Sequence, residues 1–86
     1  MSHIHAREYL AGGSAVQVNC DHQCNVLVMD DHNYRRYRQG DSFHFHGGFY
    51  RRLPAVIRVP ATGDWNVVLD LAGRRANIRY SISYRH

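Results

Sequence analysis

The sequence predicts an all-β domain: an antiparallel β-sandwich or a barrel-like, jelly-roll-like arrangement of about seven short strands. Three observations support this fold class. Apolar and polar residues alternate over short segments, turn residues separate those segments, and no strand–helix–strand alternation is present. The 86 residues are enough for one modest hydrophobic core, so we expect a single domain over residues 1–86.

The first half of the chain contains three expected strands and one helical turn. Residues 2–10 and 15–20 alternate with a period of two, which is typical of a strand with one buried face. Residues 25–29 include four successive apolar positions, as in a central strand covered on both faces. An Asp-rich start, aromatic residues three positions apart and a closing Gly40 predict one or two helical turns near residues 31–39.

Two more strands are expected in the middle of the chain. Residues 42–46 predict a strand with its two phenylalanines on one side and its two histidines on the other. The glycine pair Gly47-Gly48 then breaks or bulges that strand. Residues 54–60 predict a strand bounded by two prolines.

The last third has the clearest alternation. Residues 65–71 and 78–85 each alternate between apolar and polar side chains. A turn at Ala72-Gly73-Arg74 lies between them, and two such segments across a short Gly-containing loop predict a β-hairpin.

Composition points to an ordinary globular chain. Hydrophobic residues make up 44% and charged residues 21% of the sequence. No cationic stretch followed by an apolar run opens the chain, and no segment approaches the ~20 apolar residues of a membrane-spanning helix. We therefore expect a cytoplasmic, bacterial-type protein with no membrane partner and with reduced cysteines. The net charge of +4 comes from Arg without any Lys, which slightly favours an anionic partner.

Four groups of residues occur in a characteristic order. They are Asn25-Val26-Leu27-Val28-Met29-Asp30-Asp31, then Asn33-Tyr34-x-x-Tyr37-x-x-Gly40, then Gly47-Gly48, then Val59-Pro60-x-x-Gly63-x-Trp65-x-Val67-Val68-x-Asp70-Leu71. The series resembles the small bacterial family known as domain of unknown function 1883, over about residues 3 to 84. The resemblance implies a compact all-β domain, alone or joined to a Toll/interleukin-receptor domain. It implies no known activity, cofactor or catalytic residue.

A zinc-type metal site is one alternative function. His44 and His46 lie two positions apart, so in a strand both would point to one face and could bind one ion. Cys20 and Cys24 would add thiolate ligands suited to zinc. Against this, the cysteine spacing is not that of a Cys-x-x-Cys knuckle. A cupin-type jelly roll also has a Glu soon after its His-x-His, whereas the only Glu here is Glu8.

The two cysteines also permit a redox interpretation. If Asp21-His22-Gln23 formed a hairpin loop, Cys20 and Cys24 would face each other across two strands, near the ~5.5 Å Cα separation of a disulfide. The alternation instead places Cys20 in line with Val16 and Val18, as a small buried hydrophobic residue. We favour the buried interpretation for Cys20, while Cys24 could face either way.

Binding of RNA or single-stranded DNA is a further alternative. It would use the aromatic and cationic side chains of residues 34–38, with Arg51-Arg52 and Arg74-Arg75 contacting phosphates. However, Tyr34 and Tyr37 are three positions apart in a helical turn, and they are better explained as closing the end of the sandwich.

No motif of a catalytic site is present, so we expect a protein that is not an enzyme and has no cofactor. The preferred interpretation is a module that binds a protein or a small ligand through its loops or edge strands. Self-association through an edge strand is a related hypothesis. The candidate binding residues come from the helical turn and from the segment around the glycine pair: Tyr34, Tyr37, Arg38, His44, His46, Gly47, Gly48 and Tyr50.

Overall fold

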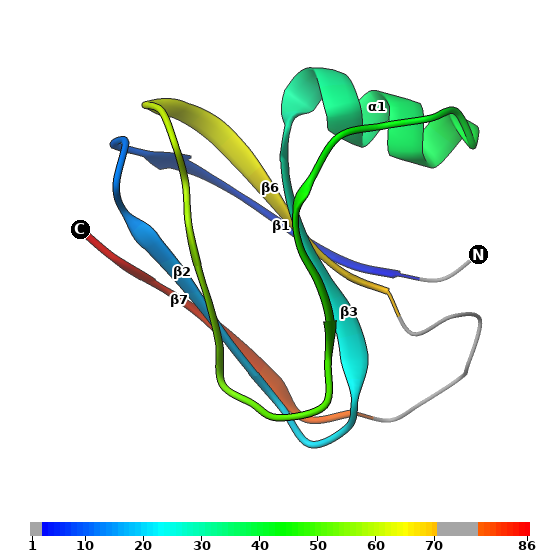
Figure 1. Ribbon diagram of the computed structural model, residues 1–86, viewed down its shortest axis with the longest axis vertical. Helices are drawn as coiled ribbons and strands as arrows, with labels where there is room; N and C mark the ends of the chain where they lie inside the picture. Colours follow the sequence, from blue (N-terminus) through cyan, green and yellow to red (C-terminus); the bar gives the residue numbers. More distant parts are fainter. Residues whose placement is uncertain (1–2, 71–77) are drawn as a thin grey trace.

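The computed structural model describes residues 3–70 and 78–86, which form seven strands and one helix (Figure 1). This confirms the predicted all-β class and the short helix. The elements are β1 (His3–Leu10), β2 (Ala15–Cys20), β3 (Cys24–Asp30), α1 (Asp31–Gln39), β4 (His46–Tyr50), β5 (Ala55–Arg58), β6 (Gly63–Asp70) and β7 (Tyr80–Arg85).

The strands form two antiparallel sheets that pack as an open sandwich. One sheet has four strands in the order β1-β6-β3-β4, and the other has three in the order β5-β2-β7. The short connections β1–β2, β2–β3 and β4–β5 each lead from one sheet to the other, so the two layers are linked repeatedly along the chain. The main core lies between the sheets, where every strand contributes apolar side chains, such as Val16, Val28 and Leu69.

A second, smaller core lies on the outer face of the four-stranded sheet. There Leu27, Met29 and Val68 are buried beneath Tyr34 and Tyr37 of α1 and beneath Phe43. This accounts for the apolar run in β3, which buries one face against the other sheet and the opposite face under the helix. The prediction of a strand covered on both faces is confirmed.

Local capping determines where the helix begins and ends. Asp30 is the N-cap, and its carboxylate accepts the backbone N–H of Asn33 at 2.9 Å. Gly40 ends the helix with a φ of 82°, and its N–H donates to the carbonyls of Arg36 and Tyr37. Among the described residues, no helix is long and apolar enough to cross a membrane.

The predicted strand over residues 42–46 is wrong. The strand here is His46–Tyr50, and Gly47 and Gly48 lie inside it rather than ending it. The preceding residues leave the sheet because they bind the helix instead: the N–H of His44 donates to the Asn33 side chain at 2.8 Å, and Phe43 packs on the outer-face core.

The predicted hairpin between residues 65–71 and 78–85 is also wrong. Strand β6 lies between β1 and β3, whereas β7 pairs with β2 in the other sheet. Residues 65–69 are all buried, which suits a strand with a neighbour on each side and both faces covered. The turn expected at residues 72–74 falls outside the described residues.

Candidate functional site

The inner face of α1 meets β1 in a cluster of four rings, which we call the His–Tyr junction: His3, His5, Tyr34 and Tyr37. The His5 ring stacks on Tyr34 with centroids 4.0 Å apart and planes 11° from parallel. His3 and Tyr34 form a 3.0 Å hydrogen bond between Nε2 and the hydroxyl. The Tyr37 hydroxyl donates to Asp70 at 2.6 Å, and burial followed by this bond raises the pKa of Tyr37 above its usual range.

Beside this junction, a buried amide connects the sheet to the start of the helix. Asn66 is 0% exposed, and its Oδ1 accepts a hydrogen bond from Nε2 of His5 at 2.8 Å. Its Nδ2 donates to the carbonyl of Met29 at 3.3 Å and to Oδ1 of Asp31 at 2.8 Å. Asp31 also accepts two bonds from Arg7, at 3.0 and 2.7 Å. Hydrogen bonds from Arg7 and then from Asn66 hold the pKa of Asp31 well below its usual range.

The polar side chains of the junction and of Asn66 are hydrogen-bonded to other protein groups. The four rings and the Asn66 amide attach the helix to the sheet, and buried polar networks of this kind specify one docking geometry. We therefore assign the junction a positioning role, because it fixes α1 and the segment that follows it beside β4.

Acidification should destabilise the domain through His3. Burial, and then the neighbouring His5, lower the pKa of His3 below its ordinary value of 6.5, whereas the carboxylate of Asp70 opposes that shift. Because the unfolded chain then binds the proton more readily, the contribution of His3 to stability is complete above about pH 6.5 and is lost as the pH falls towards the folded-state pKa.

Urea midpoints measured at about pH 7.5 and 5.5 test this expectation. The difference between the two midpoints should shrink in His3→Gln and stay as in the wild type in His32→Gln, since His32 is an exposed residue of the helix. An unchanged difference in His3→Gln would contradict it.

The most exposed apolar side chains on this side of the molecule belong to β4 and the residue preceding it. Phe49 is 55% exposed, and Phe45 is 44% exposed and contacts the Phe43 ring at 5.4 Å. In the β3–β4 ladder Phe49 pairs with Asn25, whose side chain points to the same face as that of Leu27, two positions further along β3. Phe49 therefore lies on the outer face of the larger sheet. We call Phe45 and Phe49 the phenylalanine face.

The other candidate residues of this segment point in different directions. The ring of His46 lies 5.9 Å from that of Trp65, and Tyr50 packs against the main core between the sheets. His44 is exposed. Gly47 and Gly48 have φ angles of 113° and 151°, which place them in backbone conformations that side chains rarely adopt. Within β4, Gly48 directly precedes Phe49 of the phenylalanine face.

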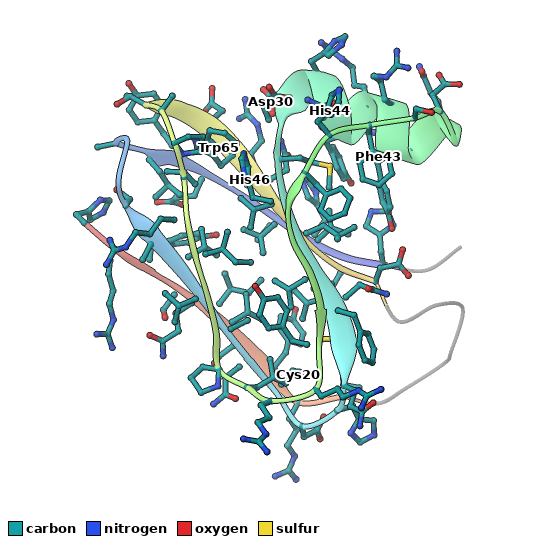
Figure 2. The ribbon with its side chains drawn as sticks, in the orientation of Figure 1. Cys20, Asp30, Phe43, His44, His46 and Trp65 are labelled. Atoms are coloured by element: carbon teal, nitrogen blue, oxygen red, sulfur yellow. The ribbon has the colours of Figure 1, made fainter. Side chains whose placement is uncertain are left out.

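The four residues of the metal alternative do not come together. His44 and His46 lie towards one end of the sandwich and Cys20 at the other (Figure 2). Tyr50 pairs with Cys24, and His46 precedes Tyr50 by four positions, or about 13 Å of extended strand. No group of three or more His, Cys, Asp or Glu side chains able to hold a metal is found among the described residues.

The cationic residues of the helix surround a separate surface. Arg38 lies over the ring of Tyr34, 5.8 Å from its centroid, and a pocket of about 340 Å³ is lined by Arg35, Arg38 and Gln39. The tyrosine rings face the sheet, where they contact His3 and His5, instead of closing the end of the sandwich as expected. They are therefore not free to stack on nucleic acid bases.

Together, the two sheets, the capped helix and the partnered junction define a small β-sandwich domain with one helix docked on the outer face of its larger sheet. The chain belongs to the family described as Domain of unknown function (DUF1883), which it matches over residues 1–85. A search of the curated proteins and a search of the solved structures found no match.

Three features of the site were missed by sequence reasoning. The alternation over residues 2–10 puts His3 and His5 on one face of a strand, but it gives no sign of their partners 31 and 61 positions away. Asn66 alternates with apolar residues like any solvent-facing position. Phe49 carried a usable signal, because an aromatic residue two positions beyond Gly47 follows the same alternation as Phe45.

Proposed function

We propose that this domain is a non-catalytic interaction module that binds an extended segment of a partner protein along β4. The observation that carries the proposal is the phenylalanine face, two exposed aromatic rings on and beside the outer strand of the larger sheet. In keeping with the expected cytoplasmic, bacterial setting, the partner would be a protein of the same compartment.

The position of β4 supports an extended partner. Among the described strands, β4 pairs only with β3, so the backbone groups on its other side are placed to pair with an added strand. Edge strands are commonly protected by charged residues or prolines, and the sequence HGGFY of β4 contains no proline, lysine or arginine. Its two glycines carry no side chain that would hold another backbone away.

The outer face adds a means of recognition. A strand that pairs with β4 would present alternate side chains to Phe45 and Phe49, and aromatic rings dominate the energetics of protein interfaces. The His–Tyr junction supports this role by fixing α1, so that Phe43 and Phe45 are presented from an ordered segment. We infer a preference for apolar side chains at alternate positions of the bound segment.

Selection from a random peptide library displayed on phage tests the proposal. Peptides enriched on the wild-type protein should lose about tenfold or more in affinity for Phe49→Ser. The matched control is Tyr9→Ser, because Tyr9 is 64% exposed but lies on β1, at the other edge of the same sheet. Binding should be the same for Tyr9→Ser and the wild type.

Two results would count against the proposal: no enrichment over an uncoated surface, or selected peptides whose affinity is insensitive to Phe49→Ser and Phe45→Ser. Light scattering on the same samples identifies the remaining alternative. A concentration-dependent dimer abolished by Phe49→Ser would show that β4 binds a second copy of the chain instead of a foreign segment.

A further inference from the structure

Two thiols meet at the end of the sandwich opposite His44 and His46. Cys20 ends β2 and Cys24 begins β3, and the loop Asp21-His22-Gln23 between them leads from one sheet to the other. The hairpin loop that the redox interpretation assumed is therefore absent, because the two strands are in different sheets. Cys20 is 9% exposed and Cys24 is 2% exposed, as the buried interpretation of Cys20 predicted, and both thiols are free.

The thiols are neighbours within the main core. Both side chains belong to the cluster between the sheets. Burial, followed by the charge and hydrogen bond of the adjacent Cys20 thiol, raises the pKa of Cys24 to about 12. Only three residues separate the two cysteines, and both side chains belong to this cluster, so the thiols lie near each other at the corner where the sheets join.

Of the two cysteines, Cys20 is the one that lines a surface pocket. A pocket of about 340 Å³ opens at this corner, lined by Asn19, Cys20, Asp21, Arg79, Tyr80 and Ser81. Cys24 is not part of its wall. Among its described lining residues, Arg79 is cationic and Asp21 is anionic, and these can pair with the carboxylate and the ammonium group of a peptide-like ligand.

From this arrangement we propose that Cys20 and Cys24 form a thiol–disulfide exchange site for a small anionic disulfide of the glutathione type. Arg79 would attract a carboxylate of the ligand, while the hydroxyl of Ser81 and the amide of Asn19 suit its peptide groups. Cys20 is the thiol that the ligand meets, and Cys24 is the thiol behind it.

The exchange has two steps. The thiolate of Cys20 attacks one sulfur of the oxidised ligand, a mixed disulfide forms at Cys20, and one ligand thiolate leaves and takes up a proton. Cys24 then loses its proton and attacks the Cys20 sulfur, and the second ligand thiol is released. In total, the two cysteines lose two electrons and two protons, and the oxidised ligand is reduced to two thiols.

The fold favours the second step in spite of the raised pKa of Cys24. The attacking thiol is held beside its target, and such proximity replaces a collision between separate molecules. The product would link β2 to β3, and hence one sheet to the other, inside the core. A buried disulfide is poorly accessible to external thiols, so its reduction should be slower than its formation.

Mass spectrometry of the intact chain after incubation with oxidised glutathione, without oxygen, tests the proposal. The wild-type protein should lose about 2 Da, the mass of two hydrogen atoms. Cys24→Ser should instead retain one glutathionyl group at Cys20, and Cys20→Ser should remain unmodified over the same period. Circular dichroism confirms that both variants are folded.

Arg79→Gln separates recognition from simple thiol reactivity. Its reaction with oxidised glutathione should be about three- to tenfold slower than that of the wild type, whereas its reaction with the neutral bis(2-hydroxyethyl) disulfide should be unchanged. Peptide mapping of the wild-type product requires no variant and should show the Cys20–Cys24 link. A glutathionyl group that persists on the wild-type chain, or thiols that react only after denaturation, would overturn the proposal.

Discussion

Replacing Gly47 by alanine is expected to cost at least about 3 kcal/mol of stability, the sum of a steric overlap and a backbone penalty. The added carbon would overlap the carbonyl oxygen of Val26 and lie 3.1 Å from Cδ1 of Ile57. The carbonyl belongs to the neighbouring strand of the ladder and has little room to move. The φ of 113° adds strain for any residue with a side chain.

Thermal unfolding followed by circular dichroism measures this effect, with an expected fall in Tm of roughly 10–20 °C. Gly48→Ala is the matched control, because its φ is 151° but its added carbon would meet nothing within 4 Å. It should cost only the backbone strain, about 1–2 kcal/mol. Equal losses in the two variants would show that the overlap with Val26 is unimportant.

Asn66→Ala is expected to cost about 3 kcal/mol, because it removes a buried amide and leaves several partners unsatisfied. The carbonyl of Met29 loses a donor within the sheet, and His5 and Asp31 each lose one bond on the side of the helix. The loss should reach α1, since Asn66 bonds directly to Asp31 in the first turn of the helix.

Urea unfolding gives the size of the effect, and hydrogen exchange shows where it occurs. The amides of α1 should exchange faster in Asn66→Ala than in the wild type. Asn19→Ala is the control: the same substitution at an exposed position of β2 removes only the bond from the backbone N–H of Cys20 and should change stability by less than about 1 kcal/mol. A stability of Asn66→Ala within that range would show that the buried amide contributes no net stability.

Features that depend on neighbouring residues could be predicted from the sequence. Strand β2 follows from its alternation, and the helix from the cap at Asp30 and the left-handed Gly40. These signals are local, because side-chain direction repeats every two residues in a strand and capping involves residues a few positions apart.

Strand pairing could not be predicted in the same way. The hairpin was expected from adjacency in sequence, yet β6 pairs with β1 and β3. The position of β6 between two neighbours depends on the helix that covers Val68, and on the hydrogen bonds that allow Asn66 to be buried. Both conditions depend on residues more than thirty positions away in the sequence. The alternation of side chains within β6 therefore does not indicate them.

The candidate site was predicted only in part for the same reason. Tyr34, Tyr37 and Arg38 were correctly placed on the helix, but the rings turn inward because β1 presents His3 and His5 to them. The sequence predicted a strand that ends at His46, whereas β4 begins at His46. Phe49 therefore lies within the strand, whereas His44, a predicted binding residue, lies outside the ladder.

The pairing of β1 with β6 affects the order in which the strands can pair during folding. His3 pairs with Asp70 and Leu10 with Gly63, so a strand made early finds its neighbour only after most of the chain has been synthesised. During synthesis, β1 could not pair until β6 had been made, so the larger sheet could form only at a late stage. Such non-local pairing slows folding to the millisecond-to-second range for domains of this size. During this interval the apolar β3 lacks one of its two neighbours, and an exposed apolar strand of this kind favours aggregation.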